Sequence, residues 1–197
     1  KEKLMSDSKT DTKILRAAQA LLARGGLGAV SFDAIARELG ISKQAVLYWF
    51  PSKSDLLSAM FVGWLDAEAR EAEASLQTIR TSNEAIDAFV RSITQFHKGD
   101  LDRFRMMYLA PQTLKSGVQE ARDSDVLDKI HETTSRLYSA LAERLDGSPD
   151  QTRQAAFAVH SATLGLILML GLAESIGDPL AHSEHDLVVA LIAKLSS

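Results

Sequence analysis

Apolar residues recur at three- and four-residue spacing along most of this chain, and alternating β-branched runs are nearly absent. Such spacing is typical of amphipathic helices, whereas half-buried strands need strict alternation. Only four prolines interrupt the pattern. The sequence therefore predicts an all-α protein with about nine helices. We expect them over residues 11–24, 32–39, 43–50, 54–77, 82–98, 101–110, 124–145, 149–174 and 184–195.

Serine and glycine residues mark the predicted helix ends. Ser31 and Ser42 precede short helices, where a serine oxygen accepts a hydrogen bond from the first turn. Gly40 ends the first of these helices, because glycine tolerates a left-handed backbone. Ser148 and Gln151 have the spacing of a capping box. Each of these signals indicates where a helix begins or ends.

The two short helices and the Gly40-Ile41-Ser42 turn between them predict a helix-turn-helix. The second helix directs four polar or aromatic side chains outward, namely Lys43, Gln44, Tyr48 and Trp49. Lysine and glutamine can bind base edges or phosphates, and tyrosine can donate to a phosphate. The pattern suits a nucleic-acid groove as the partner, and it suits a small helical hairpin with a solvated face equally well.

The charge distribution supports two modules. Residues 1–60 carry nine Lys or Arg against six Asp or Glu, a balance of +3. Residues 61–197 carry thirteen against twenty, a balance of −7, and the sum is the net charge of −4. A basic head on an acidic body indicates different partners. We expect a disordered, polar N-terminal arm at 1–9, a helix-turn-helix domain at 10–53 and a ligand-binding and dimerisation domain at 54–197.

Composition excludes several classes of protein. The 197 residues are 46% hydrophobic, which suffices for a buried core. The absence of cysteine excludes disulfide scaffolds and thiolate metal sites. The longest apolar run, Leu164 to Ala173, is too short to span a bilayer, and the polar start does not look like a secretory signal. We expect a soluble, cytoplasmic protein that has no membrane partner.

Residues 10–60 resemble the DNA-binding domain of the TetR (tetracycline-repressor) family of bacterial transcription regulators. The matching segments are Lys13-Ile14-Leu15, Gly25-Gly26-Leu27, Ser31 to Ala36, Leu39 to Lys43 and Phe50 to Leu57. The match covers about a quarter of the chain, and its ordered combination is specific. The chain length and the helical remainder also fit this family, which places a divergent ligand-binding and dimerising domain after the head.

The resemblance implies phosphate contacts at Ser31 and Lys53. It implies groove contacts from Ser42, Lys43, Gln44, Ala45, Tyr48 and Trp49. The sequence departs from the family pattern at Leu47, where tyrosine is usual. Tyr48 lies about 100° further around the helix and cannot simply replace that tyrosine. The resemblance further implies a dimeric repressor that binds a pseudo-palindromic double-stranded DNA operator and is released by a ligand.

The helix expected at 149–174 is apolar on nearly all sides and therefore needs burial on more than one side. Small residues at Ala158, Ala162 and Gly165 allow a close helix approach. With Leu187 and Leu191 of the last helix, they predict a four-helix interface in a homodimer. A core within one chain is the alternative.

Methionine, aromatic and histidine residues in the body are candidates for an effector pocket. The candidates are Phe96, Met106, Met107, Tyr108, His131, Tyr138 and His160. They favour a small hydrophobic or aromatic effector with one or two hydrogen-bonding groups. The alternative is that most of them are ordinary core residues.

The sequence gives no sign of a catalytic site, a cofactor or a metal. His182 and His185 have metal-like spacing, but no further ligand is placed beside them. No phosphate loop or nucleophile elbow appears. We therefore do not expect an enzyme. Two alternatives stay open, namely a DNA-binding regulator or structural protein controlled by a partner, and an enzyme with an accessory DNA-binding head.

Overall fold

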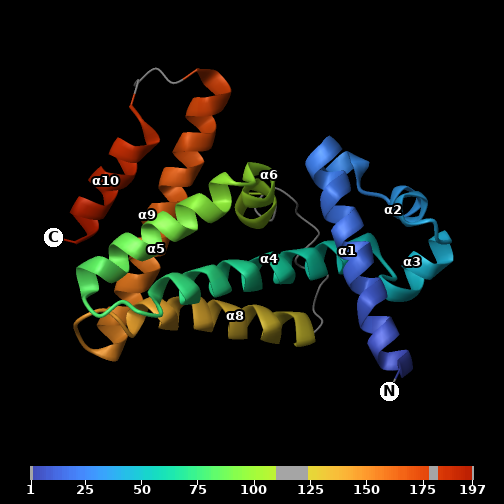
Figure 1. The fold of residues 1–197 in the computed structure, drawn as a ribbon, viewed down its shortest axis with the longest axis horizontal. Coiled ribbons are helices and arrows are strands. Elements are labelled where there is room, and N and C mark those ends of the chain that lie inside the picture. The colour runs from blue at the N-terminus through green and yellow to red at the C-terminus, as the bar shows by residue number, and fades with distance from the viewer. Residues whose placement is uncertain (1, 110–123, 178–181, 197) are drawn as a thin grey trace. The chain divides into compact units, whose positions relative to one another are not determined.

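The computed structural model describes residues 2–109, 124–177 and 182–196, and every regular element in these ranges is a helix (Figure 1). The elements are α1 Glu2–Ala29, α2 Phe32–Leu39, α3 Lys43–Trp49, α4 Lys53–Leu76, α5 Ser82–Lys98, α6 Leu101–Phe104, the π-helical η1 Arg105–Leu109, α8 Ser124–Ala142, α9 Pro149–Ile176 and α10 Glu184–Leu195. The all-α prediction is confirmed, and most helix bounds differ from the predicted ones by no more than a few residues.

The first helix differs most from its prediction. It begins at Glu2, so residues 2–9 are helical where a disordered arm was expected. No proline or glycine interrupts the chain before Gly25, so a longer helix forms without strain. At Gly25 and Gly26 the backbone leaves the helical region, with φ of −150° and +66°. The helix is therefore interrupted where the prediction ended it, and a short helical segment continues to Ala29.

The described chain separates into two compact units. The first comprises residues 1–64 and 102–129, and the second comprises residues 65–101 and 130–197. One boundary falls within α4 and another within α8. The first unit therefore extends past the predicted boundary at residue 53 and includes the beginning of α4.

The first unit contains the helix-turn-helix. α2 packs against both α1 and α3, as the blue and cyan ribbons of Figure 1 show. Its core is built from side chains that have no solvent exposure, namely Ile14, Ala18, Val30, Ile35, Val46, Leu56 and Met60. Gly40 takes the left-handed conformation, with φ of 65°, and its N–H donates to the carbonyls of Ala36 and Arg37. The predicted turn is thus fixed by its glycine.

The second unit is a bundle formed by the later part of α4, α5, the end of α8, α9 and α10. Polar contacts show the arrangement, because Ser92 of α5 bonds Glu71 and His97 of α5 bonds Glu68. α5 therefore runs antiparallel to α4. α9 packs against α5 and α10. The core of this unit includes Leu76, Phe89, Ile93, Leu141 and Ile167.

α9 is apolar on both its buried and its exposed sides. Phe157, Leu168, Met169 and Leu172 are 57%, 42%, 56% and 47% exposed. Within the described residues, α9 is the one helix long and apolar enough to cross a membrane. The uninterrupted apolar run in the sequence, Leu164 to Ala173, is only a part of this helix. The opposite side of α9 carries His160, which bonds the buried Glu68. One side of α9 therefore packs in the bundle, and none of the described residues covers the other.

Candidate functional site

The helix-turn-helix is held by its two serine caps. Ser31 Oγ accepts the N–H of Ala34 at 3.1 Å, and Ser42 Oγ accepts the N–H of Ala45 at 3.1 Å. Both caps satisfy a backbone donor that the first helical turn leaves unpaired. The prediction that these serines begin α2 and α3 is confirmed. Their predicted DNA contacts stay predictions.

α3 presents the side chains expected for a groove. Lys43 and Gln44 are exposed, and Tyr48 is 79% exposed although it is a large aromatic residue. Trp49 is half-buried and meets Tyr48 edge to face, with ring centroids 5.4 Å apart. Val46 is fully buried and attaches the opposite side of α3 to the core. The polar side of α3 therefore faces away from the core of the first unit.

The two lysines named for DNA contact have partners within the first unit. Lys43 Nζ lies 2.9 Å from Asp33 Oδ2, with the two side chains 49% and 63% exposed. Lys53 Nζ donates to the carbonyl of Leu27 at 3.4 Å. Exposed ion pairs contribute little to stability, so both ammonium groups can exchange these partners for a phosphate at small cost.

The other predicted contact positions are less accessible. Ala45 is half-buried beneath the outer side of α3. Leu47, which stands where the family usually has tyrosine, is also half-buried. Tyr48 therefore does not occupy the position of the missing tyrosine, as the sequence indicated.

A buried polar network lies at the centre of the second unit. Glu68 has no solvent exposure, and its Oε1 is 2.8 Å from His97 Nε2 and 3.1 Å from His160 Nε2. Tyr138 Oη lies 3.3 Å from His160 Nδ1. The network joins α4, α5, α8 and α9. Because a charge in a core must be paired and hydrogen-bonded, the two histidines explain how a carboxylate is tolerated there.

The geometry assigns the protons of this network. An ionised carboxylate only accepts hydrogen bonds, so both Nε2 atoms donate to Glu68. Burial by itself would raise the pKa of Glu68, but hydrogen bonds from His160 and His97 outweigh it and lower the pKa to about 2. Burial, followed by the charge of Glu68, raises the pKa of Tyr138.

The predicted pocket residues divide between the two units. Tyr138 and His160 lie together in the second unit, and Phe96 contacts the ring of His97 at 5.0 Å. His131 is exposed on α8. The remaining candidates lie on η1 in the first unit, where Met107 is buried and Met106 and Tyr108 are half-buried. The assignment of these residues to a ligand stays a prediction.

Sequence reasoning missed Glu68 as a site residue and left His97 out of the pocket. A signal for Glu68 exists, because it falls on the three- and four-residue spacing of the buried Leu65, Ala72 and Leu76. A carboxylate on an apolar stripe requires a buried partner. His97 lies on the equally apolar stripe of α5 and supplies that partner.

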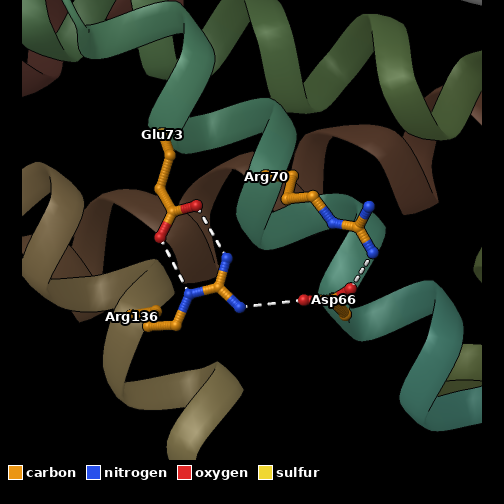
Figure 2. A network of polar contacts seen from close by, with 4 residues as sticks. All are labelled: Asp66, Arg70, Glu73 and Arg136. Carbon is orange, nitrogen blue, oxygen red and sulfur yellow. Dashed lines mark hydrogen bonds and ion pairs between the residues drawn. The ribbon is translucent and has the colours of Figure 1, made fainter.

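Two open grooves lie in the second unit. The first, the α8–α9 groove, has a volume of about 400 Å³ and is lined by Thr134, Tyr138, Arg153, Gln154 and Phe157. The second, of about 260 Å³, lies beside Arg136 of α8 and Glu73 of α4. There the Arg136 guanidinium binds Glu73 through two nitrogens, at 2.9 and 2.7 Å, and Asp66 at 2.8 Å (Figure 2). Arg70 adds a further ion pair to Asp66.

The small residues predicted for a dimer interface are accessible in the single chain. Ala158 and Gly165 of α9 are exposed, and a Cβ added at Gly165 would meet nothing within 4 Å. Ala162 is half-buried, as are Leu187 and Leu191 of α10. Their role between subunits stays a prediction.

The histidine pair before α10 has other neighbours. His182 and His185 are exposed. Ser183 caps α10 through the N–H of Asp186 at 3.1 Å, and Glu184 pairs with Lys98. In the described part of the chain, no three histidine, aspartate or glutamate side chains are grouped as metal ligands.

Comparison with known proteins gives a family match for the helix-turn-helix region and a similar fold for the whole chain. Residues 14–60 match the family model described as bacterial regulatory proteins, tetR family. A comparison with curated proteins gives no match.

Three solved structures illustrate the likeness. A transcriptional regulator of the TetR/AcrR family from Thermobifida fusca superposes with a TM-score of 0.61 at 24% identity, covering 96% of this chain and 97% of that one. FadR from Bacillus subtilis, in complex with stearoyl-CoA, gives 0.66 at 16% identity, covering 94% and 97%. FadR from Bacillus halodurans, a fatty acid degradation regulator, gives 0.64 at 15% identity, covering 95% and 94%. These likenesses establish the fold.

The sequence match and the geometry coincide in the first unit. The matched residues 14–60 span α2, α3 and the turn between them. The helix-turn-helix within residues 14–60 therefore matches that of the tetR family of bacterial regulatory proteins.

Proposed function

We propose that this protein is a homodimeric transcriptional repressor that binds a pseudo-palindromic DNA operator and is released by a small effector. The observation that carries the proposal is the outer side of α3, where Lys43, Gln44 and a 79% exposed Tyr48 project from a capped helix-turn-helix. In this proposal residues 10–53 bind DNA, and residues 54–197 bind the effector and the second subunit. The protein acts in the cytoplasm, without a catalytic role.

The DNA contacts divide into two kinds. Lys43, Gln44 and Tyr48 enter the major groove with the N-terminal part of α3, together with Ser42, Ala45 and Trp49 at its edges. Ser31 and Lys53 bind phosphates on either side of the groove. Phosphate contacts position a protein on DNA and base contacts specify the sequence. We therefore assign sequence preference to Lys43 and Gln44.

The dimer forms through the exposed side of α9 and through α10. This side combines large apolar residues such as Met169 with small ones at Ala158 and Gly165. Exposed apolar patches of this kind mark interaction surfaces, and twofold dimers are the commonest oligomers. Ala162, Leu187 and Leu191 complete the proposed interface. Two copies of α3 then read half-sites about 34–36 Å apart.

An effector in the second unit shifts the population of dimers away from the DNA-binding form. A ligand can shift this equilibrium only by its differential affinity for the two forms. The structure of Bacillus subtilis FadR with stearoyl-CoA supports effector binding by a protein of this fold. We infer a largely apolar effector for this chain as well.

The test begins with selection of bound duplexes from a random library by the full chain. The expected product is an inverted repeat whose half-site centres are one helical turn apart. Lys43→Ala should reduce enrichment, while replacement of Lys129, an exposed lysine on α8, by alanine should not change it. Enrichment of no sequence, or of sites without symmetry, contradicts the proposed operator. Binding that no small molecule releases would favour control by a protein partner.

A further inference from the structure

The α8–α9 groove combines an apolar wall with polar side chains. Tyr138 and Phe157 form the wall, with ring centroids 5.6 Å apart and planes inclined by 56°. Phe157 is 57% exposed in the single chain, and it borders the side of α9 that we propose for the dimer. Thr134 and Gln154 add hydrogen-bonding groups to the lining. The volume of about 400 Å³ lies within the range of small-molecule sites.

One charged side chain lines this groove. Arg153 is exposed, and it makes no ion pair with the residues that the structure describes. Arg136 and Arg144 of the same unit, by contrast, each bind a carboxylate. The guanidinium of Arg153 acts on the groove electrostatically, because its charge lowers the pKa of Tyr138 against the larger effects of burial and Glu68. The groove is therefore complementary to an anion.

We propose that the α8–α9 groove binds a small aromatic carboxylate, whose ring packs against Tyr138 and Phe157 and whose carboxylate pairs with Arg153. This inference rests on the proposed function, because it names a chemical class for the effector. Arginine binds carboxylates through two parallel hydrogen bonds. Because the lining contains a single arginine, we expect a ligand with one negative charge. A polyphosphate would leave further negative charge without a partner in this lining.

Tyr138 connects the groove to the interior. Its ring forms part of the wall, and its hydroxyl meets His160, which in turn binds Glu68 of α4. The ring of a bound ligand would therefore contact Tyr138, whose hydroxyl is hydrogen-bonded to the buried network. α4 continues in the chain from Lys53, directly after the helix-turn-helix. This gives a ligand in the groove a route of direct contacts to a helix shared by both units.

The test compares a charged probe with its neutral isostere. The full-length protein is titrated calorimetrically with 2-naphthoate and with 2-naphthamide, which have the same ring system. We expect 2-naphthoate to bind at least about tenfold more tightly, a ratio that corresponds to about 1.4 kcal/mol. Arg153→Gln should abolish this preference. Arg80→Gln, which removes an exposed arginine outside the groove, should preserve it.

Three results would overturn the inference. They are the absence of 2-naphthoate binding to the folded protein, equal affinity for the two probes, and an equal loss of preference in the Arg153 and Arg80 variants. Tyr138→Ala supplies a second check, because removal of the ring should weaken both probes alike. If both probes bind the variant as they bind the wild type, the ring wall is not part of the site.

The failure of this inference is distinguishable from failure of the proposed function. DNA binding is measured separately, on the duplexes selected above and without any probe. A protein that binds its operator as a dimer but does not bind 2-naphthoate overturns only the ligand assignment. A protein that binds 2-naphthoate through Arg153 but selects no DNA sequence supports the groove and contradicts the regulator.

Discussion

Lys43 Nζ and Asp33 Oδ2 lie 2.9 Å apart and join the first turn of α3 to the first turn of α2. Both side chains are exposed, so the pair contributes at most about 1 kcal/mol to stability. A DNA phosphate or a guanine edge that approaches α3 competes with Asp33 for the same ammonium group. The ion pair therefore works against DNA binding while it holds Lys43 on the outer side of α3.

The first prediction follows from this competition. Asp33→Asn should tighten binding to the selected duplex, because the substitution removes both a competitor for Lys43 and a negative charge near the DNA. Lys43→Ala should weaken binding by about 1–3 kcal/mol. Fluorescence anisotropy at several salt concentrations measures both effects. Asp87→Asn, in the second unit, is the control. Weaker binding by the Asp33 variant would show that Lys43 needs the carboxylate to be positioned.

Lys53 should behave differently from Lys43. It stands at the start of α4 and reaches the carbonyl of Leu27, where a phosphate can replace a weak partner. Lys53→Ala should weaken binding to selected and random duplexes by the same factor and reduce the slope of log affinity against log salt by about one. If affinity for random duplexes stays the same while operator affinity falls, Lys53 reads sequence and not the backbone.

The sequence predicted the helix-turn-helix in detail because its signals are local. A serine cap acts within three residues, and Gly40 needs only its own backbone angle. α1 was predicted less well, because composition gives no sharp start between Glu2 and Thr10. The predicted end at residue 24 is matched, because the backbone leaves the helix at Gly25 and Gly26.

The candidate site in the second unit was only partly predictable. Tyr138 and His160 were chosen by residue type, and they do meet. Their common partner Glu68 comes from α4, 92 residues before His160. Periodicity places each residue on a face of its own helix but gives no information about which faces meet. The buried network and the groove beside Arg153 therefore required the three-dimensional arrangement.

The exposed side of α9 leads to a prediction about assembly. A Cβ added at Gly165 would meet nothing within 4 Å in the described part of the chain, so the position is open within one subunit. Gly165→Leu should convert the dimer to a folded monomer, because overpacking separates closely packed helices. Sedimentation velocity reports the mass, and circular dichroism reports the helix content. Gly165→Ala, which adds one carbon and improves helix propensity, should remain dimeric. A dimeric leucine variant would exclude Gly165 from the interface.

Arg136 predicts a coupling between α8 and α4. It binds Glu73 and Asp66 at once (Figure 2), and its hydrogen bond lowers the pKa of Glu73. Arg136→Gln should destabilise the protein by about 1 kcal/mol, with a smaller difference at high salt. Arg91→Gln breaks a single pair within α5 and should cost less. Urea unfolding measures both. Equal losses would show that the network adds nothing to an isolated pair.

The buried carboxylate of Glu68 should make stability depend on acid. Its pKa is about 2 in the fold against an ordinary value of 4.5, so the unfolded chain binds its proton more tightly. The resulting stabilisation, about 3 kcal/mol, is complete above pH 4.5 and is lost as pH falls from there towards 2. Glu68→Gln keeps one acceptor oxygen for the histidines but cannot titrate. Its free energy of unfolding, measured with urea between pH 6 and 3, should therefore vary less than that of the wild type.

If Glu68→Gln does not fold, the wild-type profile alone still tests the sign, since a stability that stays constant or rises below pH 4.5 contradicts an ionised Glu68. Tyr138→Phe leaves the bonds from both histidines to Glu68 in place and should retain the wild-type acid profile, which separates the role of the carboxylate from that of the network as a whole.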